Sequence, residues 1–484
     1  MPEMQLRAGV AKSEITTGEE GILISDPLYA KALVLDDGIT KAVIIAMDAL
    51  AIGGLGDIKD DFLPKLRARI ENELHIPGGN VLVNASHTHP QGRLLCDDAE
   101  QVERTFEAVR QALQKMTEVR AGSGFGHEDR IVVNRNLKMK DGSHWSIRYA
   151  HPCPEDKEVA DIGPIDPSIG VLRLDRLDGQ PLAVVYNFAS HLLIGVPERG
   201  VTANFTGFAS KVIEENLGNG VMALFLQGAG GDILEVFFKD VNRPRNCEPL
   251  GTMLGLSTLK AVRKIQTKDA GLNVLSETIR LPVRKNIPER MEARLQEQAK
   301  LLATLRSTTL NFKTFLPLYI KYALNPDYPS DYAYRYMQEE RIGSNELVSM
   351  DVHNRGNLDR YLNNIYTMEK LIRIQEDLAT FQYHETLLRE AGGETVPAEV
   401  QGVKIGDCAL ITAPAELLVE IGLNLKKASP YEHTFVSAFT NGYLHYAAPV
   451  EHYGKGGYEV TECMLAEEWQ EAYESKAYDI LRRL

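Results

Sequence analysis

The chain has 484 residues, of which 44% are hydrophobic and 25% charged, and its formal net charge is −14. This composition is that of a globular protein, and the negative charge disfavours nucleic acid as a partner because phosphate binding needs a basic surface. Since no secretory signal, no membrane-spanning apolar run and no C-x-x-C pair is present, we expect a cytoplasmic protein with reduced thiols and no stable membrane insertion.

The first half of the chain alternates short β-rich runs with amphipathic stretches. The expected strands are 31–34, 42–47, 81–83, 171–174, 182–187 and 222–226. The expected helices are 61–74 and 100–116, where apolar residues recur at helical spacing. This order predicts an α/β fold, with a layered mixed β-sheet and helices.

The segment 285–395 differs in character from the rest of the chain. Its stretches 288–304 and 361–390 are long, charged and helical in spacing. We predict a mainly helical insertion here, serving as a lid or as a homo-oligomer interface. The main domain would then comprise 1–284 and 396–484. In its second part we expect strands 403–405, 409–411 and 435–439, and a helix over 415–427.

Two expected strands end in histidines. Residues 84–92 read N-A-S-H-T-H-P-Q-G after the strand 81–83, and His191 follows the strand 182–187. His87 and His89 lie two apart, so on an extended segment they point to the same side. A neutral imidazole can bind zinc, and strands of an α/β sheet bring such residues to one edge. A hydrogen-bonded polar turn or a core histidine is the alternative for each stretch alone.

A glycine-rich stretch, Q-G-A-G-G-D over 227–232, follows the expected strand 222–226. It has neither the P-loop lysine nor the spacing of a dinucleotide fingerprint. We expect Gly230 and Gly231 to let backbone amides approach a ligand or a metal-bound group. Asp232 would orient a histidine, with a turn-capping aspartate as the alternative.

Two later stretches carry oxygen donors. In A-P-A-E over 413–416, Pro414 and Glu416 are expected to open a helix, where a carboxylate either favours the helix dipole or binds a metal. Tyrosines are frequent in N-G-Y-L-H-Y over 441–446 and in G-G-Y-E over 456–459. Phenols line pockets, donate to oxyanions or bind zinc, and they also pack under loops.

Together and in this order, these stretches resemble the neutral/alkaline ceramidase family, which has a zinc-containing amidase domain. The similar features are S-H-T-H, a strand-end histidine after N-x-x-x, a Gln–Gly–Asp stretch, P-x-E and N-x-Y-x-x-Y. Residues 8–16 and G-P-I-D-P at 163–167 also look like parts of that domain. The resemblance covers most of 6–280 and 400–465.

The resemblance implies one Zn²⁺ per chain and assigns roles to several residues. The implied zinc ligands are His87, His191, Glu416 and Tyr446. The implied catalytic residues are His89 and Tyr446, for proton transfer or oxyanion stabilisation, with Arg135 of the N-R motif and Asp232. The implied substrate-binding residues are Gly230, Gly231, Tyr443 and Tyr458. Bound zinc would lower the pKa of a water towards about 7 and polarise the scissile carbonyl.

The chain also departs from the family pattern. Leu234 stands where ceramidases carry a serine once proposed as the nucleophile, and Asn204 replaces an aspartate. The family's signal peptide and C-terminal β-sandwich are not expected, which argues against a sphingolipid substrate. We therefore expect a zinc hydrolase that cleaves an amide, ester or lactone bond of a small polar substrate, such as a carbohydrate derivative. A metal-dependent carbohydrate isomerase or lyase, and a non-catalytic ligand-binding relative, are the alternatives.

Overall fold

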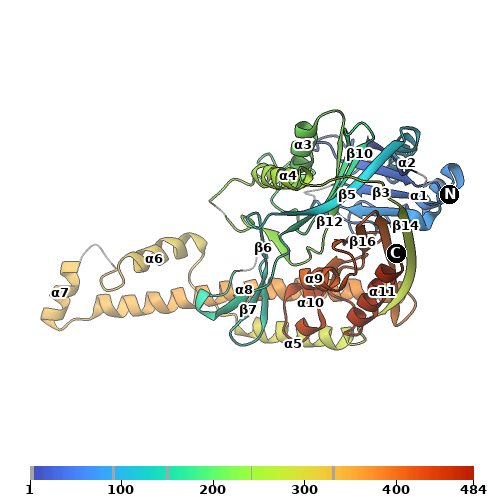
Figure 1. The fold of residues 1–484 in the computed structure, drawn as a ribbon. Helices are drawn as coiled ribbons and strands as arrows, with labels where there is room; N and C mark the ends of the chain where they lie inside the picture. The colour runs from blue at the N-terminus through green and yellow to red at the C-terminus, as the bar shows by residue number, and fades with distance from the viewer. Residues whose placement is uncertain (1–4, 90–92, 149–151, 241, 330–332) are drawn as a thin grey trace. The chain divides into compact units, whose positions relative to one another are not determined.

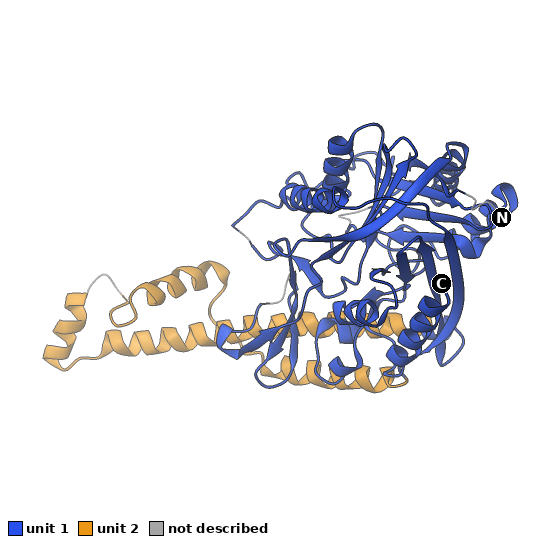
Figure 2. Cartoon of the chain, viewed as in Figure 1, with its two compact units in different colours: residues 1–284, 388–484 blue, residues 285–387 orange. Residues whose placement is uncertain are grey.

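The computed structural model describes residues 5–89, 93–148, 152–240, 242–329 and 333–484. The chain forms two compact units (Figure 2). Unit 1 comprises residues 1–284 and 388–484, and unit 2 comprises residues 285–387. The sequence placed the second boundary at 395, whereas the compact units divide inside helix α8 (Glu346–Glu390).

The main sheet of unit 1 has eight strands in the order β12-β11-β10-β5-β1-β2-β3-β4 (Figure 1). Their bounds are β1 Arg7–Glu14, β2 Tyr29–Asp36, β3 Lys41–Met47, β4 Val81–Ala85, β5 Thr117–His127, β10 Ser168–Arg176, β11 Pro181–Phe188 and β12 Met222–Gln227. The pairs β3–β4 and β11–β12 are parallel, and the other neighbours are antiparallel. The sheet is therefore mixed, as predicted.

A second sheet, in the order β14-β15-β16-β18, packs against one face of the main sheet. Its strands are β14 Leu272–Pro282, β15 Thr395–Ile405, β16 Cys408–Thr412 and β18 His433–Ser437. The shared core contains Leu33 and Leu172 from the first sheet with Leu410 and Phe435 from the second. Because Pro282 of β14 pairs with Thr395 of β15, unit 2 is inserted between two paired strands of unit 1.

Helices complete the layers of unit 1. Helices α2 (Asp98–Gln114), α3 (Asn204–Leu217) and α4 (Glu248–Val262) pack on strands of the main sheet, and α1 (Phe62–Leu74) packs on α2. Helices α9 (Val419–Ala428) and α11 (Trp469–Arg483) pack on the second sheet. This arrangement confirms the predicted α/β layered fold.

Short elements connect the layers around the strand ends. They are β6 Val132–Asn134, β7 Asn136–Met139, β8 His144–Ser146, β9 Val159–Ile162, β13 Ile233–Glu235, β17 Glu416–Leu417, β19 Tyr446–Ala447, α10 Tyr458–Glu462 and the 3₁₀ helices Gly78–Asn80, Asp156–Glu158 and Val450–His452. The prediction that Pro414 and Glu416 open a helix is wrong. Glu416 pairs in β17 with Tyr446 of β19, and helix α9 begins only at Val419.

Unit 2 is helical, as predicted. It contains α5 (Ile287–Thr304), α6 (Phe312–Leu324), α7 (Ala333–Ile342) and α8. Phe315 and Tyr322 of α6 pack with Leu358 of α8 in a small core, whereas Leu316 and Ile320 on the other side of α6 are exposed. Within the ranges described above, no helix combines the length and the apolar character needed to cross a membrane.

Candidate metal centre

The predicted residues meet where strands of both sheets end. Strands β4, β11 and β12 lead into the segments that carry His87, His191 and the glycine-rich stretch, and Gln227 links these segments. The Gln227 amide Nε2 donates to Ser86 O at 2.9 Å and to Ser190 O at 2.7 Å, and its backbone N–H donates to Asn84 Oδ1 at 2.8 Å. A buried glutamine thus fixes the two histidine-bearing segments relative to each other.

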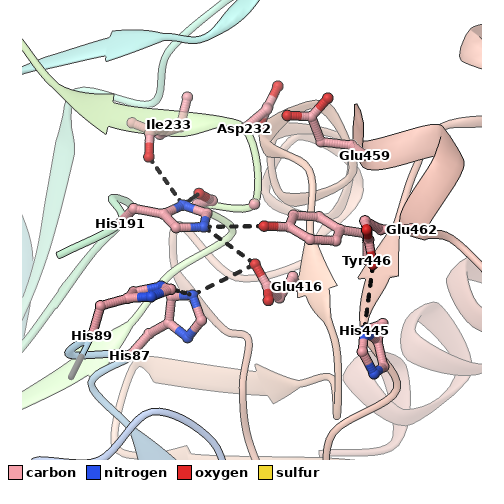
Figure 3. Close-up of polar contacts among 12 residues, drawn as sticks. His87, His89, His191, Asp232, Ile233, Glu416, His445, Tyr446, Glu459 and Glu462 are labelled. Atoms are coloured by element: carbon pink, nitrogen blue, oxygen red, sulfur yellow. Dashed lines mark hydrogen bonds and ion pairs between the residues drawn. The ribbon is translucent and has the colours of Figure 1, made fainter. Parts of the chain in front are cut away.

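The two strand-end histidines are held in one tautomer. His87 Nδ1 donates to Leu50 O at 2.8 Å, and His191 Nδ1 donates to Gly230 O at 2.8 Å. Because a carbonyl oxygen only accepts, Nδ1 carries the proton of each neutral ring and Nε2 offers a lone pair. Both Nε2 atoms face the centre of the cluster (Figure 3), which is the usual arrangement of metal-binding histidines. Burial lowers the pKa of His87 to about 4, so its ring is neutral at pH 7.

His89 joins the same cluster. Its Nε2 lies 3.0 Å from His87 Nε2, and the ligand atoms of His87, His89 and His191 lie within 4.8 Å of one another. His87 and His89 were expected on an extended segment, but a different backbone conformation brings their side chains together. Strand β4 ends at Ala85, and His87 adopts the left-handed conformation with φ +66°, which bulky residues rarely take. The His87 ring packs on Phe439, with ring centroids 4.2 Å apart.

Glu416 supplies a carboxylate to the cluster. Its Oε2 lies 3.3 Å from His191 Nε2 and 3.6 Å from His87 Nε2, and the Tyr443 hydroxyl donates to its Oε1. Burial acts to raise the pKa of Glu416, but the attraction of the two imidazoles in their protonated forms and the hydrogen bond from Tyr443 outweigh it and hold the pKa below the usual value. The carboxylate is therefore ionised.

The arrangement of these atoms fits a zinc ion. Glu416 Oε2 is buried and has no hydrogen-bond partner among the described residues, and a buried oxygen without a partner is costly. Zinc–ligand bonds of about 2.0–2.1 Å place neighbouring ligand atoms about 3–3.5 Å apart. The two contacts of 3.3 Å from His191 Nε2, to Glu416 Oε2 and to the Tyr446 hydroxyl, match this spacing.

Tyr446 is oriented by a buried arginine. Arg135 Nη2 donates to the Tyr446 hydroxyl at 2.8 Å and to Gly231 O at 2.8 Å, while its Nε donates to Glu459 Oε1 at 2.5 Å. Arg135 is 5% exposed and Glu459 is fully buried. Burial raises the pKa of the Tyr446 phenol well above its ordinary value.

Tyr458 lies beside Tyr446 at the partly exposed side of the cluster. The two rings meet edge to face with centroids 5.3 Å apart, and the Arg148 guanidinium lies 3.8 Å above the Tyr458 ring. The Tyr458 backbone N–H donates to Ser146 Oγ, which itself donates to Glu459. Tyr443, the other tyrosine predicted to bind the substrate, donates a hydrogen bond to Glu416.

Asp232 does not orient a histidine, so this part of the prediction is wrong. Its Oδ1 accepts from Val419 N at 2.9 Å and its Oδ2 accepts from Asn134 Nδ2 at 2.7 Å. The turn at Gly230 brings backbone carbonyls to His191 Nδ1, which leaves that position to the main chain. Asp232 therefore anchors the start of α9, and burial raises its pKa to about 6.

Backbone packing requires glycine at both Gly230 and Gly231. A Cβ on Gly230 would lie 2.7 Å from Ser190 N, and one on Gly231 would lie 2.7 Å from Glu416 O. Their carbonyl groups accept hydrogen bonds from His191 and Arg135. The glycine-rich stretch thus positions two site residues through its main chain.

Sequence reasoning missed Glu459 and the orienting role of Tyr443. Glu459 is 324 residues from Arg135 in the chain, and no spacing rule connects them. The only signal was the position of Glu459 directly after the tyrosine of G-G-Y-E.

Comparisons with known proteins bear on the fold. No family model matches the chain, and no curated protein matches it. Solved structures do match, among them a ceramidase complexed with C2, with 15% identity and a TM-score of 0.63, and the neutral ceramidase from Pseudomonas aeruginosa, with 16% identity and a TM-score of 0.62. The fold is similar to that of the neutral ceramidases. The ceramidase-like region covers 99% of this chain, and 76% and 75% of those two chains.

Proposed function

We propose that the protein is a zinc-dependent hydrolase that cleaves an amide bond, or an ester or lactone bond, of a small polar substrate. The observation that carries the proposal is the convergence of two tautomer-fixed imidazoles on a buried carboxylate oxygen without a partner. The neutral-ceramidase-like fold supports amide hydrolysis in particular, since ceramidases are amidases.

Four residues would hold the ion: His87, His191, Glu416 and Tyr446. Two nitrogen and two oxygen donors favour zinc among the common divalent metals. When bound, zinc supplies an activated water and polarises the substrate carbonyl. The protein contributes fixed imidazole orientations, because each Nδ1–H is held by a backbone carbonyl.

The neighbouring side chains would serve the substrate. His89, with its Nε2 in the cluster and another part of the residue exposed, would transfer a proton to the leaving group. Arg135 holds the Tyr446 hydroxyl at 2.8 Å, so that this phenol donates to the developing oxyanion. Tyr458, half-buried beside Tyr446, would line the substrate position.

The substrate proposed is a carbohydrate-derived amide or ester. Leu234 lies where a nucleophilic serine would be required, so no acyl-enzyme forms at that position. The buried donors and acceptors around Arg135 and the tyrosines favour a polar ligand over a long alkyl chain.

The test combines metal content with activity. Zinc-loaded protein should contain one zinc per chain, and the double variant His87→Ala, His191→Ala should lose both the zinc and the hydrolysis of N-acyl, ester or lactone substrates. The matched control is His127→Ala, since His127 is 65% exposed and pairs with Asp129. Full zinc content in the double variant, or hydrolysis without metal, would refute the proposal.

A further inference from the structure

A cavity of about 820 Å³ opens in unit 1 beside the segments that carry the metal centre. One wall is formed by Ile194, Pro197 and Arg199, which follow His191, and the other by residues from 237–240 and 243–249, which follow the glycine-rich stretch. The volume lies within the range of about 300–1,000 Å³ that is typical of small-molecule sites.

The charge of this cavity is opposite to that of the chain. Among the described residues, its lining contains Arg199, Lys239, Arg243 and Arg245 and a single carboxylate, Asp240, in a protein with 67 acidic and 53 basic residues. Glu235 lies behind the lining and interacts electrostatically with Arg245. Counting it as ionised still leaves four positive against two negative charges. A concave, basic surface raises the local concentration of anions.

The cavity wall is fixed by the fold. The buried Glu235 Oε1 accepts from Leu193 N at 2.6 Å and from Ile194 N at 2.9 Å, and Cys247 N donates to Gly195 O at 2.8 Å. Arg199 is held at φ +59°, a conformation that costs free energy for a non-glycine residue. Strained residues of this kind cluster at ligand sites.

One basic side chain of the cavity lies on an apolar surface. The Arg243 guanidinium lies 4.2 Å from the centre of the Phe237 ring and pairs with Asp240 at 2.9 Å. Ile194 contributes a further apolar surface to the cavity. A ligand with both a ring or carbon skeleton and an anionic group matches this combination.

One part of the cavity lining follows a proposed metal ligand closely in the chain. Only three peptide units separate His191 from Ile194, so their Cα atoms are at most about 11 Å apart. This short separation is the reason for assigning the cavity and the cluster around His191 to two groups of one ligand.

We propose that this cavity binds the anionic group, a phosphate or a carboxylate, of the substrate whose scissile bond lies at the metal centre. The inference rests on the proposed hydrolase function and specifies its substrate class as anionic. Guanidinium groups suit this role because they form paired, charge-assisted hydrogen bonds with both anions.

Binding of a neutral and an anionic probe tests the proposal. N-acetylglucosamine and N-acetylglucosamine 6-phosphate differ only in the phosphate, and both are titrated calorimetrically into the zinc-loaded protein. The phosphorylated probe should bind about tenfold or more tightly, as expected from one charge-assisted hydrogen bond. The variant Arg199→Ala, Arg243→Ala should lose this preference and keep its zinc. If the variant keeps its zinc, the loss of preference for the phosphorylated probe is not caused by loss of the metal.

The control variant is Arg110→Ala, Arg120→Ala, which removes two exposed arginines outside the cavity. An equal loss of preference in this control would show a diffuse charge effect and overturn the proposal, as would equal binding of the two probes by the wild type. Circular dichroism checks that both variants are folded. If the protein binds the anionic probe preferentially but hydrolyses no substrate, the anion-binding cavity is supported and the hydrolase function is refuted. If it hydrolyses substrates without a preference for anions, the hydrolase function is supported and the anion-binding cavity is refuted.

Discussion

Removal of the charge of Arg135 should destabilise unit 1 more than any exposed ion pair does. The substitution Arg135→Met keeps much of the side-chain length and leaves the carboxylate of Glu459 buried without its cation. Glu459 is fully buried, and its remaining hydrogen-bond partner is Ser146. Tyr446 also loses the donor that orients its hydroxyl.

The magnitude follows from the geometry of the pair. At an N–O distance of 2.5 Å, two unit charges attract by about 7 kcal/mol at an effective dielectric constant of about 20. Desolvation of the two ions, at several kcal/mol each, offsets most of this attraction while the pair is intact. When one partner is removed, the desolvation cost of the other remains, and the expected loss is about 3–5 kcal/mol.

Urea unfolding of the metal-free protein, followed by circular dichroism, measures this loss. The double variant Arg135→Met, Glu459→Gln should be less destabilised than Arg135→Met alone, because no buried charge is left unpaired. Arg120→Met is the matched control, since Arg120 and its partner Asp269 are 51% and 63% exposed, and it should cost less than about 0.5 kcal/mol. If Arg135→Met costs no more than Arg120→Met, or if the double variant is the least stable, the reasoning is refuted.

Three further substitutions test other parts of the structure. Glu235→Gln probes pH dependence, because burial raises the pKa of Glu235 from 4.5 to about 7. Between these values the folded wild type holds a proton that the unfolded chain releases, so its free energy of unfolding should fall by about 3 kcal/mol as the pH rises from 4.5 to 7. Urea titrations at pH 5 and 7.5 should show a smaller fall in the variant, and an equal fall in both proteins would contradict the raised pKa. Gly231→Ala places a Cβ 2.7 Å from Glu416 O, whereas the control Gly271→Ala places one that meets nothing within 4 Å. Zinc affinity, measured by competition with a chelator, should fall for Gly231→Ala only. Unchanged affinity in Gly231→Ala would show that the backbone at this position relaxes. In unit 2, Phe315→Ala should cost about 3–5 kcal/mol because Phe315 is 7% exposed, while Leu316→Ala, at 42% exposure, should cost less than about 1 kcal/mol; similar costs in thermal unfolding would contradict the packing of α6.

The regular elements of unit 1 could be predicted where their apolar pattern was strong. Strand β3 is buried along nearly its whole length and helix α2 has a clear apolar face, and both were predicted within two residues of their bounds. Strand β14 was missed because most of its residues are only half-buried, so its sequence shows no run or alternation of apolar residues. The start of α9 was placed too early, since the pairing of Glu416 with Tyr446 is a tertiary contact.

The members of the candidate site could be selected because their side-chain chemistry is visible in the sequence. The groups that orient these side chains could not be predicted from the sequence. His87 is held by the carbonyl of Leu50 and His191 by that of Gly230, and a carbonyl is the same for every residue type. The Arg135–Glu459 pair depends on two distant segments meeting, which no local pattern encodes.

The insertion of unit 2 within unit 1 has a consequence for biosynthesis. His191 precedes the inserted helices, whereas Glu416 and Tyr446 follow them, so 446 − 191 = 255 residues must be translated between the second histidine and the last ligand candidate. At about 5–20 residues per second, this interval lasts roughly 13–50 s. Within that time β14 lacks its partner β15 until residues 395–405 are made, and the histidines lack their carboxylate until Glu416 is made. A nascent chain would therefore carry an incomplete centre, and the proposed zinc would be retained only after Glu416 and Tyr446 have been made.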